Sequence, residues 1–413
     1  MVTKADRTHE VLLWGATGYT GKITAEYINK NLPLDLNWAI AGRDRKKLES
    51  LNEHLKTLNP TRPLPAIEIF RLKEEDLNIL TRKTQLVIST VGPFQLYGSD
   101  LFRLCAQNGT HYVDSTGESP FVGDMIKAND DLARKNGSIV AVSHNRRIFD
   151  APTRRVDVSI HSLKGSVSGG TLSSFINAFN RYSFAQLYAI HAPYSFSPKK
   201  PTPTEPIKSS SLWIKLFGLL YIRNLGWLGY QSQSPIDRAI VHSTWGLLDG
   251  TSERYGDSFD WHAWVRLWGP IAAIFWHFTL WSLTALFSLR PVRWLLSKIW
   301  YKPGNGVAAD KIQKNWLEYR TVANVDDGPT QKPAKKRKSV ARLRFDSDPY
   351  FFTGVTLAEA AKIIVRRNDT QAHQLGGGVL TPATLGDSYV AALKEGGVTI
   401  EVKSAEGKET VKW

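Results

Sequence analysis

Residues 10–21 read EVLLWGATGYTG, a short apolar run followed directly by a glycine-rich turn. Gly15 lets the chain turn sharply after the expected strand, and Gly18 lets the backbone come close to a bound pyrophosphate. Gly21 allows the helix that starts here to pack against the strand. The amide groups at the start of that helix would face the phosphates, because a helix N-terminus favours negative charge. The stretch therefore predicts a strand–turn–helix unit that binds a dinucleotide.

The end of the second expected strand bears on which dinucleotide binds. Residues 41–47 read AGRDRKK, and Arg43 stands where an acidic residue would bind an adenosine ribose 2′-hydroxyl. An arginine suits a 2′-phosphate instead, so we predict NADP(H) rather than NAD(H). Two simpler interpretations stay open: Asp44 can serve as a helix N-cap, and the basic residues 45–47 can be a solvated helix start.

Residues 10–143 alternate short apolar runs with segments of helical periodicity. Strands are expected at 10–14, 37–41, 67–70, 86–90, 112–115 and 139–142, and helices near 75–83, 98–108 and 120–136. This alternation is typical of a parallel sheet covered by helices on both faces. Residues 1–150 are therefore expected to form an α/β domain with a doubly wound parallel sheet, the Rossmann arrangement.

Ligands of such a sheet bind at the carboxyl ends of its strands. Thr90, Gly92 and Pro93 follow the fourth expected strand and are candidates to line the nicotinamide ribose. The residues predicted to contact the dinucleotide are Gly15, Thr17, Gly18, Tyr19, Thr20, Gly21, Arg43, Thr90, Gly92 and Pro93.

The catalytic groups are harder to assign. Tyr97, Asp114 and Glu118 lie near the same expected sheet edge and are candidates for substrate binding or proton transfer, although Asp114 could equally cap a turn. The pattern of Cys and His has no metal-ligand spacing, so no metal site is expected. The histidines at 161, 191, 242 and 262 are scattered and are interpreted as structural or exposed.

The second half of the chain has a different character. Residues 151–375 are expected to form a mixed α/β substrate domain with an apolar helical insertion at about 211–302, and residues 376–413 to pack back on the first domain. Residues 267–289 carry no formal charge, and at about 1.5 Å per residue they could cross a hydrocarbon core of about 30 Å. We weigh a helix lying in the membrane interface, a spanning helix and a buried soluble helix, and favour the first.

Several of these stretches together resemble the saccharopine dehydrogenase-like oxidoreductases, a family that includes trans-acting enoyl reductases. They are WGATGYTGK (14–22), WAIAGRDRKKLE (38–49), STVGPFQLYG (89–98) and YVDSTGESPFV (112–122), with further likeness at 168–175, 237–248 and 378–386. The resemblance implies NADPH-dependent reduction, in some members of enoyl thioesters on polyketide or lipid chains. It also implies a Rossmann domain plus a mixed α/β domain, with an apolar segment linked to membranes or lipid droplets.

One stretch departs from that pattern. Relatives follow the sixth strand with a loop of the type CGFDSxPSD, whereas residues 144–152 here read HNRRIFDAP. The leading expectation is an enoyl reductase of lipid or secondary-metabolite biosynthesis. Because of the departure, two alternative functions stay open. One is a catalytically impaired membrane or lipid-droplet scaffold that keeps the cofactor fold, and the other is a saccharopine-type amino-acid dehydrogenase.

Composition limits the partners. The formal net charge of +15 and the pI of about 9.7 favour anionic partners, but no nucleic-acid-binding motif is present. Cys105 is the single cysteine, so no intramolecular disulfide can form, and the polar N-terminus predicts no signal peptide. We expect a lipophilic or carrier-linked substrate, a location on the cytoplasmic face of a membrane or on a lipid droplet, and, as a possibility, a homo-oligomer.

Overall fold

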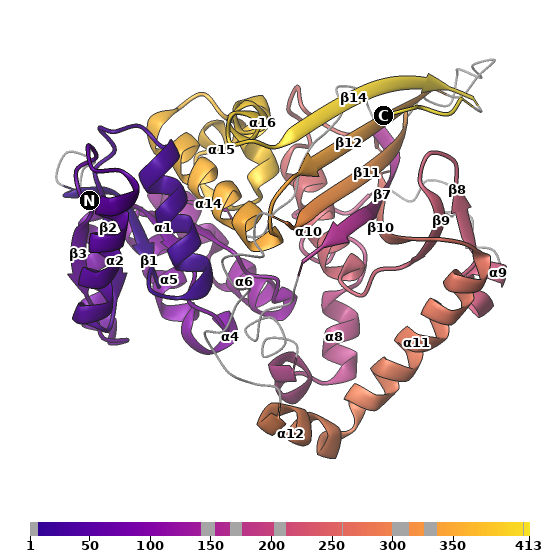
Figure 1. Cartoon of the computed structure of the whole chain (residues 1–413), viewed down its shortest axis with the longest axis horizontal. Coiled ribbons are helices and arrows are strands. Elements are labelled where there is room, and N and C mark those ends of the chain that lie inside the picture. The colour runs from indigo at the N-terminus through magenta and orange to yellow at the C-terminus, as the bar shows by residue number, and fades with distance from the viewer. Residues whose placement is uncertain are drawn as a thin grey trace.

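The computed structural model describes residues 7–141, 153–165, 176–201, 212–257, 259–299, 314–325, 337–407 and 409–413. Within these ranges the strands form two sheets, which Figure 1 shows side by side with helices between and around them. Residues 144–152, where the sequence departs from the expected loop, lie outside the described residues.

The first sheet is parallel and has the strand order β13-β6-β5-β4-β1-β2-β3. Its strands are β1 (His9–Trp14), β2 (Trp38–Gly42), β3 (Ala66–Ile69), β4 (Thr84–Ser89), β5 (His111–Asp114), β6 (Ile139–Ala141) and β13 (Gly378–Leu380). The predicted doubly wound sheet is confirmed. The chain runs outward from β1 through β2 to β3 and then returns to the other side of β1 with β4, which creates the crevice at which such sheets bind ligands.

Alternate side chains of these strands bury against two different helical layers. Val11 and Leu13 join one core cluster, and Leu12 and Trp14 join the other, because successive residues of a strand point to opposite faces. The first cluster lies under α1 (Tyr19–Asn31), α2 (Arg45–Leu58), α14 (Pro349–Arg366) and α16 (Gly386–Glu395). The second lies under α3 (Glu74–Arg82), α5 (Ser99–Asn108) and α6 (Ser119–Asn136).

The C-terminal region is shared between the two sheets. Strand β13 pairs with β6, while β14 (Thr399–Glu406) pairs with β12 (Arg337–Phe345) of the second sheet. Helix α14 packs on the first sheet and on α1, although the sequence analysis placed residues 357–365 in the second domain. A helical pattern in a sequence does not tell which sheet the helix covers. In the structure Asp348 caps this helix and Pro349 is its first residue.

The second sheet is mixed, with the order β14-β12-β11-β7-β10-β9-β8. Its other strands are β7 (Thr153–Lys164), β8 (Leu220–Ile222), β9 (Gly226–Tyr230), β10 (Asp260–Leu267) and β11 (Trp316–Val325), of which β7 and β10 run parallel. An apolar helical insertion was expected at about 211–302. The structure has helices in this range, but three of these strands also fall inside it. Dense aromatic and apolar residues hide a strand's alternation, so β8, β9 and β10 were missed.

Helix α10 (Ser234–Leu247) joins the two domains. Ala239 and Ile240 pack in the core of the first sheet, whereas Val241 and Trp245 pack against the inner face of the second sheet. The shorter helical elements are α4 (Phe94–Tyr97), α8 (Phe184–Ile190), α9 (Leu212–Phe217), α15 (Gln371–Gln374) and the 3₁₀ turn η2 (Pro382–Leu385).

Helices α11 (Pro270–Ser288) and α12 (Arg290–Ile299) follow β10. Figure 1 shows α11 running along one edge of the molecule, from α9 and β9 at one end to α12 at the other. Helix α11 is long and apolar enough to cross a membrane, yet only 11% of its most apolar 18-residue stretch is buried inside the protein. Among its residues only Ala272 and Ala273 are fully buried, so the helix is not part of a soluble core.

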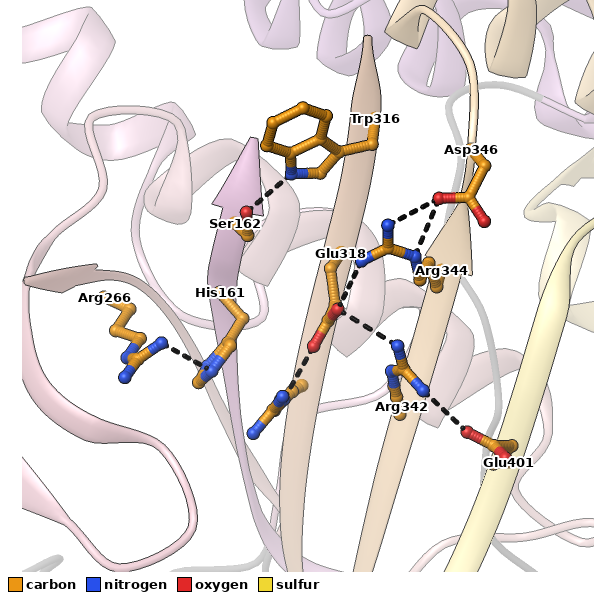
Figure 2. A network of polar contacts seen from close by, with 10 residues as sticks. His161, Ser162, Arg266, Trp316, Glu318, Arg342, Arg344, Asp346 and Glu401 are labelled. Carbon is orange, nitrogen blue, oxygen red and sulfur yellow. Dashed lines mark hydrogen bonds and ion pairs between the residues drawn. The ribbon is translucent and has the colours of Figure 1, made fainter. Parts of the chain in front are cut away.

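A buried carboxylate organises the outer face of the second sheet. Glu318 on β11 accepts hydrogen bonds from Arg320 (2.8 Å) and Arg344 (3.1 Å) and pairs with Arg342 (3.4 Å), as Figure 2 shows. Its side chain is only 5% exposed. Burial alone would raise the pKa of Glu318, but the hydrogen bonds from Arg320 and Arg344 outweigh that effect and hold it below the ordinary value of 4.5.

We predict that Glu318→Ala destabilises the chain by about 3 kcal/mol at neutral pH, because it leaves three partly buried guanidinium groups without their shared carboxylate. Asp346→Ala is the matched control, since Asp346 is 68% exposed and an exposed pair contributes only about 0–1 kcal/mol. Urea unfolding of both variants measures the difference, and equal losses would contradict this role for Glu318.

The same carboxylate predicts a pH dependence. Because the pKa of Glu318 is lower in the folded chain than its ordinary value of 4.5, its contribution is complete above that pH and is lost as the pH falls below it. The difference in unfolding free energy between the wild type and Glu318→Ala should therefore shrink when the pH is lowered from about 7 to about 3. A difference that stays constant would show that charge at Glu318 is unimportant.

Candidate NADP(H) site

The turn after β1 has the backbone geometry that the glycines predict. Gly15 has a φ of +83°, a conformation that residues with a side chain rarely adopt, and the Gly18 amide donates to the Gly15 carbonyl oxygen (2.9 Å). A Cβ atom on Gly21 would lie 2.1 Å from the Gly15 carbonyl oxygen. The helix α1 can thus approach β1 this closely only because residue 21 has no side chain.

The N-terminus of α1 is open toward solvent. Thr17 and Gly18 are exposed, and Tyr19 and Thr20 are half-buried. No side chain caps α1 at Gly18, and its first turn contains no acidic residue. The positive end of the helix dipole and its first amides are therefore available to a phosphate. These residues fit the dinucleotide that the sequence predicts, with the pyrophosphate at Gly15–Gly21.

Thr90 fixes the loop after β4 against this turn. Its amide (3.0 Å) and hydroxyl (2.8 Å) both donate to the carbonyl oxygen of Trp14, the last residue of β1. Val91 lies so close to Gly15 that a Cβ there would be 2.6 Å from Val91 Cγ2. Gly92, which is exposed, and Pro93, which is buried, continue this loop along the crevice. The structure therefore brings the predicted Thr90–Pro93 stretch directly beside the glycine turn.

Arg43 follows β2 at the same sheet edge. It is exposed and forms no ion pair with any residue that the structure describes. The neighbouring Asp44 is occupied as the N-cap of α2, where its carboxylate accepts the Lys47 amide (3.2 Å). Asp44 is thus used in the way the simpler interpretation expected, and Arg43 keeps a free guanidinium group for a 2′-phosphate.

The acidic candidates have structural partners. Glu118, which is 5% exposed, accepts the amides of Phe94 and Gln95 (both 2.9 Å), so it ties the loop after β5 to the start of α4. Asp114 accepts the Tyr112 hydroxyl (3.0 Å) and the Thr116 amide (3.1 Å). Both carboxylates therefore shape the edge of the crevice, and Asp114 does cap a turn.

Tyr97 is placed differently from the two carboxylates. It ends α4 with 46% of its surface exposed, so its phenol is open to solvent near the crevice.

Two contacts at this edge were missed by sequence reasoning. The Ser119 hydroxyl, at the start of α6, lies 2.6 Å from His191 Nε2 at the end of α8. Arg181 donates to the carbonyl oxygen of Gln95 (2.8 Å). Both pairs join residues more than 70 positions apart, so no local motif could reveal them. They place residues 181–191 of the second domain over the strand ends of the first.

Metal ions and reactive thiols each require a particular arrangement of residues. No group of three or more His, Cys, Asp or Glu residues in the described ranges is arranged to hold a metal ion. Cys105 is fully buried on α5, and burial raises the pKa of its thiol far above the ordinary value.

The chain is similar to several known proteins. Residues 11–141 match the saccharopine dehydrogenase NADP-binding domain. A provisionally named trans-acting enoyl reductase of Mycobacterium tuberculosis is 26% identical, with 97% of this chain and 99% of that protein covered. The trans-acting enoyl reductase of Mycobacterium ulcerans is 24% identical over the same shares. A solved saccharopine dehydrogenase (L-Glu forming) from Saccharomyces cerevisiae covers 96% of this chain and 100% of its own, with 12% identity and a TM-score of 0.45.

The resemblance expected from the sequence is thereby confirmed. The match of residues 11–141 to an NADP-binding domain coincides with the glycine turn, the open N-terminus of α1 and the free Arg43. The cofactor is NADP(H), and the chain is an NADP-dependent oxidoreductase.

We predict that Arg43→Ala weakens NADPH binding by about tenfold or more, equivalent to about 1.4 kcal/mol, and leaves NADH binding nearly unchanged. The reason is that the 2′-phosphate loses its only expected cationic partner. A fluorescence titration with both dinucleotides measures the two dissociation constants, with the exposed Lys46→Ala on α2 as the control. Parallel losses for both dinucleotides would mean that Arg43 does not read the 2′-phosphate.

Proposed function

We propose that the protein reduces a carbon–carbon double bond conjugated to a carbonyl group, using NADPH, on an apolar acyl or polyketide-type chain that is free or carrier-linked. The observation that carries this proposal is the likeness over nearly the whole chain to proteins named trans-acting enoyl reductases, combined with a cofactor turn suited to NADP(H). The substrate would serve lipid or secondary-metabolite biosynthesis.

The residues of the chain have distinct tasks in this reaction. The bound dinucleotide supplies a hydride. The turn Gly15–Gly21 and Arg43 hold its phosphates, and Thr90 keeps the loop after β4 beside that turn. Glu118 fixes the far end of the same loop by holding the amides of Phe94 and Gln95. These contacts position the reacting groups, which is the main contribution a protein makes to hydride transfer.

A direct test uses a 2-decenoyl N-acetylcysteamine thioester as acceptor and follows loss of NADPH absorbance. We expect the wild type to oxidise NADPH with this thioester and not with 2-oxoglutarate plus an amino acid, the pair for saccharopine-type chemistry. Tight NADPH binding without turnover on either acceptor would favour the alternative of a scaffold that keeps the cofactor fold.

We predict that Gly21→Ala lowers this activity at least about 100-fold. The new Cβ would lie 2.1 Å from the Gly15 carbonyl oxygen, so α1 would have to move away from the phosphates. Gly269→Ala is the matched control, since a Cβ there meets nothing within 4 Å. Equal activity of both variants would exclude the glycine turn as the cofactor site.

We further propose that the protein works on the cytoplasmic face of a membrane or on a lipid droplet, held by an apolar face of α9, α11 and α12. Large apolar side chains on these helices and on the residues that flank α11 are exposed to between 43% and 82%: Leu212, Trp213, Leu216, Trp268, Ile271, Phe275, Phe278, Trp281, Leu283, Leu286, Leu289, Trp294 and Leu295. So many exposed large apolar side chains on consecutive elements favour an interaction surface. Tryptophans with basic residues beside them suit a lipid interface, which also matches the positive net charge.

Both ends of α11 are fastened to the same folded body, which supports a helix lying in the interface. Near its start, Trp276 donates to the carbonyl oxygen of Tyr230 on β9 (2.8 Å). Past its end, Arg293 donates to Asn180 (2.9 Å) and to the last carbonyl groups of α11. A spanning helix would put these two attachments on opposite sides of the bilayer, so we favour the interfacial arrangement over the spanning one.

We predict that the double variant Ile271→Glu/Phe275→Glu reduces binding to vesicles of phosphatidylcholine with phosphatidylserine by at least about tenfold and leaves NADPH binding unchanged. Flotation measures the bound fraction, with Ile79→Glu on α3, also exposed (61%), as the control. High salt should weaken binding without abolishing it, since screening acts only on the electrostatic part. Complete release by salt alone would contradict an apolar anchor.

A further inference from the structure

Helix α10 carries an arginine that has no acidic partner among the described residues. Arg238 is half-buried, and its one hydrogen bond among the described residues runs to the carbonyl oxygen of His191 (3.4 Å). Its Nε atom is buried and has no acceptor. A guanidinium group withdrawn from water without a carboxylate is costly, and such a group calls for an explanation.

One turn further along the same helix, His242 presents a second donor without an acceptor. The ring is 1% exposed, and its Nδ1 accepts the backbone amide of Tyr194 (3.1 Å). Burial lowers the pKa of His242 to about 3, with Arg238 adding to the effect, so the ring is neutral at pH 7. With Nδ1 as acceptor, the proton of the neutral ring is on Nε2, and this N–H is buried without a partner.

The two donors share one face of α10. Ser234, Arg238 and His242 are spaced four residues apart and therefore line one side of the helix. Ser234 accepts the amide of Ala263, and the His242 ring stacks on Tyr194 (3.9 Å) and contacts Phe259 edge-on (6.1 Å). Arg238 contacts His191 and His242 contacts Tyr194, so both side chains lie in the layer between α10 and residues 191–194.

This layer is connected to the edge of the cofactor crevice. His191 makes both contacts of this connection. Its carbonyl oxygen accepts from Arg238, and its ring Nε2 lies within hydrogen-bond distance (2.6 Å) of the Ser119 hydroxyl. Ser119 directly follows Glu118, which holds the loop after β4. Two contacts therefore lead from the strand ends of the first sheet to Arg238. The path crosses from one domain to the other, and ligand sites often lie between domains.

We propose that Arg238 and His242 form an oxyanion site that holds the carbonyl oxygen of the unsaturated substrate. The assignment rests on the proposed reductase function and deepens it. A hydride taken from C4 of the dihydronicotinamide, which is thereby oxidised, would form a C–H bond at the β-carbon. The π electron pair of the double bond then shifts, so that an enolate forms and its oxygen gains the negative charge. The N–H groups of Arg238 and His242 stabilise that oxygen, and the α-carbon finally takes a proton from solvent to give the saturated carbonyl compound.

The alternative role of Arg238 is structural, as a cation at the C-terminal end of α8. The two roles predict opposite effects of Arg238→Met on the empty protein. Removal of an unpaired buried charge should leave the melting temperature unchanged or raise it, whereas loss of a structural contact should lower it by several degrees. Arg266→Met is the matched control, because Arg266 also contacts a histidine, His161 (2.9 Å), but is exposed on the outer face of the second sheet.

Anion binding tests the site without turnover. We expect crotonate to raise the melting temperature of the wild type and of Arg266→Met, and crotonamide, its neutral analogue, to have a smaller effect. The crotonate effect should be lost in Arg238→Met and partly restored in Arg238→Lys, which keeps the charge. A crotonate shift that persists in Arg238→Met would overturn the proposal, and this result does not depend on whether the protein reduces enoyl thioesters.

Steady-state kinetics then test whether the charge of Arg238 acts during hydride transfer. With the decenoyl thioester, Arg238→Met should lower kcat by about 100-fold while KM and NADPH affinity change less than about threefold, because the oxygen gains its charge only during hydride transfer. If the wild type turns over and Arg238→Met retains its kcat, the oxyanion site is wrong and the reductase function stands.

Discussion

The contact between the Gly15 carbonyl group and the Cα of Gly21 is the constraint on which the cofactor site depends. It sets how closely α1 approaches β1, and so where the amides at the start of that helix lie. The loop after β4 is held to the same point, because Thr90 donates twice to the last residue of β1. A larger residue at position 21 would move the helix end and the phosphate site together.

Much of the first domain could be predicted because its signals are local. Short apolar runs, glycine positions and the basic residue after β2 each act within a few residues, and the parallel sheet and the cofactor follow from them. Arg43 and Asp44 illustrate the limit. The sequence offered Arg43 as a cofactor contact and left open whether Asp44 caps the next helix. The structure shows that Asp44 is that cap and that Arg43 has no ion pair with the described residues.

The second domain was harder to predict because its signals are tertiary. Strands β8, β9 and β10 lie in a segment so rich in tryptophan and leucine that alternation is lost. The use of Glu118 as an amide acceptor, and the meeting of Ser119 with His191, depend on chain segments that are distant in sequence. The same is true of Arg238, because its place in a helical pattern gave no sign that it would lack an acidic partner in the part of the chain that the structure describes.

The two domains divide the work between them. The first provides the NADP(H) crevice, and the second brings α8 and α10 over its edge while presenting an apolar helical face outward. This division matches an enzyme that takes a hydrophobic chain from a lipid surface and reduces it beside the cofactor, the function proposed above.

Deuterium transfer tests that central claim most directly. NADPH carrying deuterium at both C4 positions, incubated with the protein and the decenoyl thioester, should yield a saturated thioester with one deuterium at the β-carbon, detected by mass spectrometry. Saturated product without deuterium, or unreacted thioester in the presence of fully bound NADPH, would contradict the proposed reduction.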